Sequence, residues 1–259
     1  MIVLSKHSLI EGITMNKKLW VVGIGPGAIS QMTIKAKETI ERCDVIAGYT
    51  GYCNLVRSYY PDKEYIETPM MGEEKRVLLA LQKADEGHEV ALICSGDAGV
   101  YGMSGLAIET AEDFPEVTVE VVSGVTAALS GGALLGAPLI HDFCLISLSD
   151  RLTPMEKIEK RLRAAAEADM VIVLYNPESK SRSGYLSHAA DVLLEILPED
   201  RVCGITRNIG RDGEAKELLT LSELKTAEAD MFCTVFIGNS STKKVGEYMV
   251  TERGYKSEG

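Results

Sequence analysis

Short apolar runs alternate with segments of helical periodicity along most of the chain. β-branched residues such as Val21, Val22 and Ile24 are concentrated in these runs, and they favour strands buried in a sheet. Strands are predicted over residues 19–24, 44–47, 89–94, 117–122, 143–148, 170–175, 202–206 and 231–237. Helices are predicted over residues 33–42, 72–84, 104–112, 154–166 and 183–197. This alternation predicts an α/β fold with largely parallel sheets and helices on their faces.

Small residues dominate positions 123–138, where a closely packed helix is predicted to end at Gly136 and Pro138. We place a domain junction at the start of this stretch. Residues 17–122 then form an N-terminal α/β domain, and residues 123–253 form a C-terminal one. Residues 1–16, which precede or include a second possible start at Met15, are expected to be a disordered extension, and residues 254–259 a tail.

Two predicted strands end in glycine-rich turns. The first reads Gly23-Ile-Gly-Pro-Gly27, and the second reads Ser95-Gly-Asp-Ala-Gly-Val-Tyr-Gly102. Glycines just past a strand allow a tight turn and a close approach of the backbone to a ligand. The pair therefore predicts one ligand held by two loops.

The first turn alone leaves alternatives open. Gly23-x-Gly25-x-x-Ala28 fits the fingerprint of an NAD(P)-dependent oxidoreductase. However, Asp44 stands at the start of the next strand rather than at its end, and Pro26 lacks the N–H that a pyrophosphate needs. A non-catalytic nucleoside-sensing module is a third possibility. In the second turn, Asp97 either accepts hydrogen bonds from a ligand or caps the backbone that follows.

Composition and charge argue against several classes of function. The chain has 259 residues and a net charge of −11, which argues against general nucleic-acid binding. No apolar stretch is long enough to span a bilayer. None of the six cysteines belongs to a Cys-x-x-Cys pair, so no zinc ribbon, iron–sulfur cluster or other metal site is predicted. Buried, reduced thiols in a cytoplasmic protein are expected.

Taken together, the motifs resemble those of the tetrapyrrole (precorrin) methylases, over roughly residues 18–253. The first turn, Ser95-Gly-Asp97 and Gly124-Val-Thr-Ala127 occur in the order of that family. Four further segments resemble its precorrin-3B C(17)-methyltransferase branch. They are residues 136–154, Leu174-Tyr-Asn-Pro177, Thr206-Arg-Asn-Ile-Gly-Arg211 and Gly238-Asn-Ser240.

The resemblance implies two α/β domains with S-adenosylmethionine in the cleft between them. It also implies which residues contact that cofactor: Pro26, Ser95, Gly96, Asp97, Val100, Thr126, Ala127, Tyr175, Asn176, Ile209 and Gly210. The missing N–H of Pro26 then does not count against the site, because S-adenosylmethionine has no phosphate to be bound. Catalysis rests mainly on holding the methyl group in line with a nucleophilic carbon.

The implied substrate is a precorrin or cobalt-precorrin, a flat tetrapyrrole with many carboxylates, which is methylated at carbon 17 with ring contraction. Methylation at another ring position remains an alternative. Arginines suit carboxylates, and the candidates are Arg151, Arg207 and Arg211, with Lys180 and Arg182 as weaker ones. Proton transfer during ring contraction points to His141, Asp142 and Tyr101 as catalytic candidates. The family also implies a homodimer.

Overall fold

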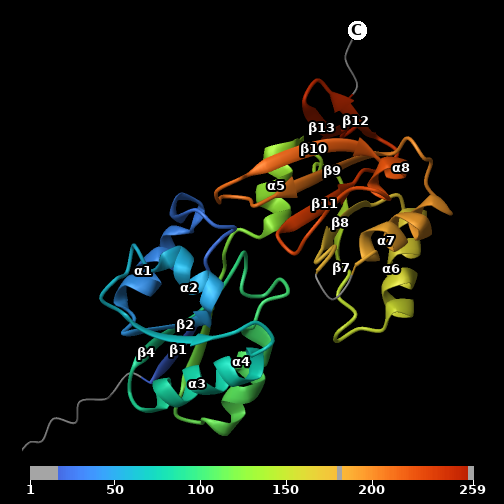
Figure 1. The fold of residues 1–259 in the computed structure, drawn as a ribbon. Coiled ribbons are helices and arrows are strands. Elements are labelled where there is room, and N and C mark those ends of the chain that lie inside the picture. Colours follow the sequence, from blue (N-terminus) through green and yellow to red (C-terminus); the bar gives the residue numbers. More distant parts are fainter. Residues whose placement is uncertain (1–16, 180–182, 256–259) are drawn as a thin grey trace, which may run out of the picture.

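The computed structural model describes residues 17–179 and 183–255, which form two five-stranded β-sheets with helices packed on them and a small three-stranded sheet (Figure 1). The first sheet is parallel and has the strand order β3-β2-β4-β1-β5. Its strands are β1 (Lys18–Gly23), β2 (Val45–Tyr49), β3 (Glu64–Thr68), β4 (Glu89–Cys94) and β5 (Thr118–Val122). All five carboxyl ends therefore lie along one edge.

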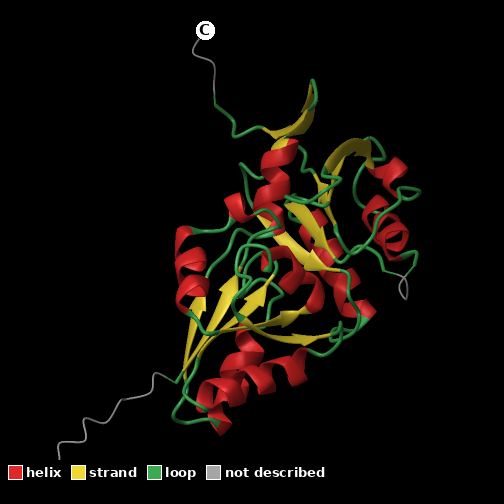
Figure 2. Ribbon diagram, turned by 60° about the vertical axis from the view of Figure 1, so that its left-hand side comes forward, coloured by secondary structure: helices red, strands yellow, loops and turns green. Residues whose placement is uncertain are grey.

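Helices cover both faces of this sheet (Figure 2). On one face, Trp20, Val22 and Ile46 pack with α1 (Ile34–Arg42) and α2 (Thr50–Val56). On the other face, Leu19 and Val21 pack with α3 (Glu73–Asp85) and α4 (Ser104–Thr110). Because successive side chains of a strand point to opposite faces, β1 is buried on both sides and reads as a continuous apolar run. Two short 3₁₀ helices, η1 (Ile29–Gln31) and η2 (Ala111–Asp113), complete this N-terminal half, residues 17–122.

The second sheet is mixed, with the strand order β10-β9-β11-β8-β7. Its strands are β7 (Phe143–Ser147), β8 (Val171–Tyr175), β9 (Val202–Arg207), β10 (Ala215–Thr220) and β11 (Cys233–Ile237). Only β7 and β8 pair in parallel; β11 runs antiparallel to β8 and β9, and β10 runs antiparallel to β9. The expectation of largely parallel sheets therefore holds for the first sheet and is wrong for the second. A short loop joins β9 to β10, and no crossover helix lies between them to make them parallel.

The helices of the C-terminal half, residues 123–255, are α5 (Ala127–Leu135), α6 (Met155–Glu167), α7 (Tyr185–Leu194) and α8 (Leu221–Leu224). As predicted, α5 ends at Gly136, which has a φ of 126°. A small third sheet joins β6 (Gly136–Ala137) to β12 (Thr242–Val245) and β13 (Tyr248–Thr251).

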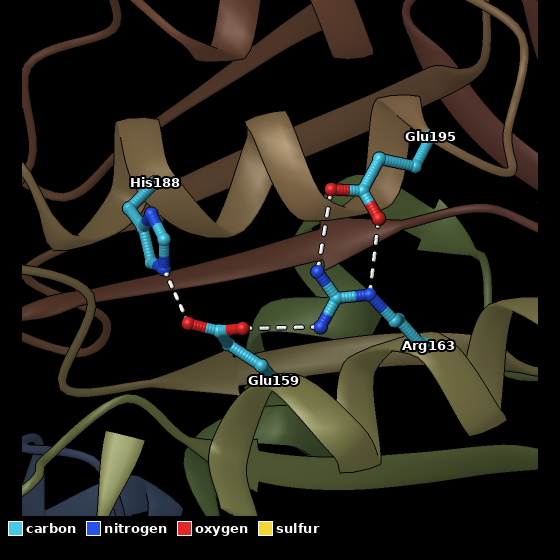
Figure 3. Close-up of polar contacts among 4 residues, drawn as sticks. All are labelled: Glu159, Arg163, His188 and Glu195. Atoms are coloured by element: carbon cyan, nitrogen blue, oxygen red, sulfur yellow. Dashed lines mark hydrogen bonds and ion pairs between the residues drawn. The ribbon is translucent and has the colours of Figure 1, made fainter. Parts of the chain in front are cut away.

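Figure 3 shows a polar network that joins α6 to α7. Arg163 donates to Glu195 through Nε at 3.0 Å and through Nη2 at 3.2 Å, and to Glu159 through Nη1 at 3.1 Å. The other oxygen of Glu159 lies 2.9 Å from His188 Nε2. These contacts hold the pKa of Glu159 below its ordinary value, with the His188 hydrogen bond as the largest cause.

Each half has its own hydrophobic core, and α5 adds a small cluster against the second sheet. The division of the chain after residue 122 stays a prediction. The expected extension, residues 1–16, lies outside the described residues, as do residues 256–259 of the expected tail.

Candidate active site

A pocket lies between the two halves, at the carboxyl ends of β1 and β4 and at the end of β8. The N-terminal half lines it with Pro26, Tyr52, Ser95, Gly96, Val100 and Tyr101. Thr126 and Ala127 line it at the start of α5. Tyr175, Asn176, Asn208, Ile209 and Arg211 close it from the C-terminal half, next to the segment Met231–Thr234. Most residues that the resemblance assigned to the cofactor thus meet in one cavity.

The two glycine turns touch each other directly. Gly25 N donates to Gly96 O at 3.0 Å, and Gly96 N donates to Gly25 O at 2.7 Å. Both residues have positive φ, +74° for Gly25 and +69° for Gly96, which glycine adopts without strain. Behind them, a Cβ on Gly124 would lie 2.1 Å from Gly96 O and 2.5 Å from Gly23 O. Three loops therefore pack backbone against backbone, and side chains are excluded between them.

Asp97 braces these loops. Its Oδ1 accepts hydrogen bonds from the backbone N–H groups of Gly99 at 2.8 Å and Val100 at 3.2 Å. Its Oδ2 accepts from Gly124 N at 2.9 Å, which ties the β4 loop to the segment after β5. Asp97 does not line the pocket. These contacts match the capping alternative for Asp97, and its role as a cofactor ligand stays a prediction.

Two tyrosines, Tyr101 from the N-terminal half and Tyr175 from the C-terminal half, contact each other beside α5. Tyr175, at the end of β8, places its hydroxyl 2.6 Å from Thr126 Oγ1, and Ala128 N donates to that hydroxyl at 2.8 Å. Tyr101 has a φ of 53°, and its hydroxyl donates to Leu145 O at 3.0 Å. The Tyr101 and Tyr175 ring centroids are 5.2 Å apart. Burial raises the pKa of both phenols, so both are neutral at physiological pH.

Arg211 joins the two halves on the other side of the pocket. Its Nε donates to Pro26 O at 3.0 Å, and its Nη2 donates to Ser95 Oγ at 3.1 Å. The guanidinium carbon lies 5.4 Å from the Phe232 ring centroid. Arg211 is the one charged side chain among the described residues that line the pocket. Desolvation lowers the pKa of Arg211, and an arginine stays charged despite such a shift.

The loop after β9 differs in detail from the prediction. Ile209 is buried and lines the pocket, whereas Gly210 does not. A Cβ on Gly210 would lie 2.1 Å from Gln31 Oε1 and 2.9 Å from Ala28 N. Gly210 therefore serves the close packing of the two halves; of the two predicted neighbours Ile209 lines the pocket, and a cofactor contact of either residue stays a prediction.

The catalytic candidates His141 and Asp142 do not reach this pocket. They precede β7, and they line a separate shallow hollow with Asp169 and Asn239. The pocket lies at the carboxyl ends of β7 and β8, so the length of a five-residue strand, about 16 Å, separates the two places. Of the three catalytic candidates Tyr101 lines the pocket, while His141 and Asp142 lie apart from it, and their catalytic role stays a prediction.

Two of the three predicted substrate arginines also lie elsewhere. Arg207 donates to Glu228 O and, at 3.2 Å, to Cys233 Sγ, and it pairs with Glu217 at 3.7 Å. Arg151 is exposed in the loop after β7. Neither lines the pocket, and their substrate-binding role stays a prediction. The weaker candidates Lys180 and Arg182 lie outside the described residues.

The residues missed by the sequence analysis are Tyr52, Asn208, Met231, Phe232, Cys233 and Thr234. Tyr52 lies in α2, a helix that was not predicted, because its seven residues show little helical periodicity. Asn208 follows β9 within a motif that was recognised, and its positive φ of 49° fits a tight turn.

The dinucleotide hypothesis does not fit the geometry. Asp44 precedes β2, and its carboxylate accepts from Glu89 N at 3.1 Å at the amino edge of the sheet, away from the pocket. The glycine turn does not lead straight into a helix either, since η1 and Thr33 separate it from α1. Within the described ranges, no cluster of His, Cys, Asp and Glu side chains could hold a metal, and no helix is long and apolar enough to cross a bilayer.

The thiols agree with the sequence prediction. Five of the six cysteines are buried, Cys144 is half-buried, and all six are unpaired. Burial raises the pKa of Cys43 to about 12 and that of Cys94 to about 11. Such thiols are protonated and unreactive at neutral pH.

Comparison with curated proteins finds close relatives over almost the whole chain. The probable cobalt-factor III C(17)-methyltransferase of Salmonella typhimurium is 44% identical over 238 residues, 92% of this chain and 99% of the relative. The precorrin-3B C(17)-methyltransferase of a Sinorhizobium species is 38% identical over 235 residues, 89% of this chain and 92% of the relative.

Solved structures agree with this assignment. The crystal structure of the methyltransferase CobJ matches with a TM-score of 0.83 and 34% identity, and it covers 90% of this chain and 99% of that one. The uroporphyrin-III C-methyltransferase of Thermus thermophilus in complex with S-adenosylhomocysteine matches with a TM-score of 0.67 and 21% identity, over 85% of this chain and 97% of that one, and shows the fold alone.

The family model of the tetrapyrrole (corrin/porphyrin) methylases matches residues 18–225, which include both glycine turns and the loop after β9. The strand order, the cleft between two α/β halves and these matches lead to one conclusion: the chain is a methyltransferase and belongs to the tetrapyrrole methylase family.

Proposed function

We propose that this enzyme transfers a methyl group from S-adenosylmethionine to carbon 17 of cobalt-factor III or precorrin-3B, with ring contraction, in cobalamin biosynthesis. The relatives named for these activities support the substrate class. The observation that carries the proposal is the pocket itself. Its lining holds one cation and no acidic side chain, within a chain whose net charge is −11.

The pocket lining fits S-adenosylmethionine. Val100, Ala127 and Ile209 offer apolar walls for an adenine, while Ser95, Thr126 and Asn176 offer polar groups for a ribose or an amino-acid moiety. No phosphate-binding helix end is required, which agrees with a proline in the first turn. When bound, the cofactor would supply an electrophilic methyl group; the protein's part is to orient the two reactants and to exclude water.

The C-terminal half completes the pocket and fixes its shape. Tyr175 caps the start of α5, and Arg211 bonds to both glycine turns, so the cofactor loops and the second sheet are held in one arrangement. This pre-organisation is what an in-line transfer needs, because a misplaced methyl group reacts slowly.

We further propose that the enzyme is a cytoplasmic homodimer. The homodimer rests on the family, and the location on the unpaired, buried cysteines. Light scattering at micromolar concentration tests the assembly; a mass of about 56 kDa, twice the 28.1 kDa of one chain, is expected, and a mass of one chain would contradict it.

Calorimetry with S-adenosylhomocysteine and NAD tests the cofactor. Micromolar binding of S-adenosylhomocysteine and no binding of NAD are expected. A preference for NAD would contradict the proposal. Binding of S-adenosylhomocysteine without methyl transfer to any precorrin or cobalt-precorrin would favour a nucleoside-sensing module.

A further inference from the structure

Tyr52 is one of three tyrosines among the described residues that line the pocket. It lies in α2, just after β2. Its ring meets the Tyr49 ring edge to face, with the centroids 5.1 Å apart and an interplanar angle of 89°. This contact fixes the position of the Tyr52 ring beside the pocket.

The other two tyrosines of the pocket have committed hydroxyls. Tyr101 donates to Leu145 O, and Tyr175 is bonded to Thr126 and to Ala128 N. For Tyr52, no hydrogen bond to its hydroxyl occurs within residues 17–179 and 183–255. A pocket phenol without a protein partner is available to a ligand.

Burial raises the pKa of Tyr52, and this effect prevails. The charge of Arg211, at the pocket wall, is the largest influence that lowers the pKa of Tyr52. Cys94 and Tyr49 add to the rise, and Arg76, in α3, lowers the pKa least of all. The phenol is therefore neutral at physiological pH and acts as a hydrogen-bond donor.

Arg76 is an uncommon buried cation. It is 3% exposed, and it donates to Thr68 Oγ1 at 2.8 Å, Pro69 O at 3.0 Å and Met103 Sδ at 3.3 Å. None of these acceptors is a carboxylate, and no ion pair of Arg76 occurs in the part of the chain that is described. Burying a charge without a counter-charge destabilises the folded state, so an arginine at this position indicates a functional role.

The neighbourhood of Tyr52 suits a flat polyanion better than it suits the cofactor. Arg211, whose charge acts on Tyr52, also lies 5.4 Å from the Phe232 ring centroid. Phe232 is 41% exposed and Met231 is 38% exposed. Half-exposed apolar side chains beside the Arg211 cation match the face and a rim carboxylate of a tetrapyrrole.

We propose that the Tyr52 hydroxyl donates a hydrogen bond to a carboxylate of the tetrapyrrole substrate, in the positive field of Arg211, to which Arg76 adds a smaller part. This inference rests on the proposed function and adds a substrate-binding residue to it. It also explains how a chain of net charge −11 accepts a polyanion, since Arg211, the charged side chain of the described pocket lining, lies in the same pocket as this phenol.

The test compares Tyr52→Phe with Tyr59→Phe, a control on an exposed tyrosine just after α2. Losing a donor to a carboxylate is expected to raise KM for cobalt-factor III about tenfold in Tyr52→Phe. The affinity for S-adenosylhomocysteine, measured by calorimetry, should stay within about twofold in both variants. The control should match the wild type with both ligands.

Three results would overturn the inference. An unchanged KM in Tyr52→Phe would mean that only the ring matters. A loss of S-adenosylhomocysteine affinity with an unchanged tetrapyrrole KM would assign the hydroxyl to the cofactor. A wild-type enzyme that methylates no tetrapyrrole would overturn this inference together with the proposed function, and so differs from the first two results.

A direct measurement covers the case in which Tyr52→Phe is unstable. In wild-type protein with ¹³C-labelled tyrosine, the Cζ resonance of Tyr52 should move when uroporphyrin III, a tetrapyrrole polycarboxylate, is added. A resonance that stays in place while the tetrapyrrole binds would contradict the hydrogen bond.

Discussion

Replacing Asp97 with alanine should destabilise the N-terminal half rather than merely remove a ligand contact. The carboxylate accepts three backbone hydrogen bonds, and two of the donors, Val100 N and Gly124 N, are partly buried. Leaving a buried donor unsatisfied costs about 1–3 kcal/mol. Because water reaches the exposed Gly99 N–H, we expect a total loss of roughly 2–6 kcal/mol from the two remaining donors.

Urea unfolding followed by the fluorescence of Trp20 measures this loss. Trp20 is the one tryptophan of the chain, is 5% exposed and lies in β1, so its signal reports on the N-terminal half. Asp113→Ala, at an exposed position in η2, is the control and should leave the midpoint unchanged. Asp97→Asn keeps one acceptor oxygen and should lie between the alanine variant and the wild type.

The reasoning is refuted if Asp97→Ala keeps the wild-type unfolding midpoint. If it also binds S-adenosylhomocysteine far more weakly, the carboxylate contacts the ligand instead of bracing the loops. A lower midpoint together with weaker binding agrees with loops that lose their shape.

Three further predictions concern the cleft and the helical layer. Arg211→Gln should raise KM for the tetrapyrrole about tenfold, whereas Arg207→Gln should change it by less than about twofold, which steady-state kinetics will show. Gly96→Val should weaken S-adenosylhomocysteine binding in calorimetry, because a β-branched residue is strained at a φ of +69°. The pKa of Glu159 is lower in the folded protein than the ordinary carboxyl pKa of 4.5. Its contacts therefore stabilise the fold fully above pH 4.5, and this stabilisation is lost as the pH falls through the pKa of the folded state. The stability advantage of the wild type over Glu159→Gln should therefore shrink on acidification below about pH 4.5, as measured by thermal unfolding.

The pocket lies beside the two glycine turns, whose spacing after apolar strands is visible in the sequence. Gly23 and Gly124 leave no room for a side chain, and Gly25 and Gly96 have positive φ, so all four positions favour glycine. Arg211, which the sequence also singled out, lines the same pocket, and its role stays a prediction. Helix α2 and strands β3 and β10 were not predicted, because their apolar patterns are short and interrupted by polar residues. In β3 (Glu64–Thr68), for example, pairing with a neighbouring strand, and not the residue pattern, makes the segment a strand.

Strand geometry explains why some of the predicted site residues lie away from the pocket. Arg207 and Thr206 are neighbours in β9, so they point to opposite faces; Thr206 approaches Gly131 of α5, and Arg207 points away. His141 and Asp142 precede a strand, and groups at the amino end of a parallel strand lie opposite the edge where ligands bind. Of the three donors to Asp97, Gly99 and Val100 are local and match the capping alternative, whereas Gly124 lies 27 residues further along the chain, where local patterns cannot reveal it.

The most direct test of the account is the site of methylation. Purified enzyme is incubated with S-adenosylmethionine that carries a ¹³C methyl group and with cobalt-factor III or precorrin-3B, and the product is examined by NMR. The account predicts one new ¹³C methyl resonance, coupled to the neighbours of carbon 17 in a contracted ring. A labelled methyl group on another ring carbon, or no transfer to either tetrapyrrole, would contradict it.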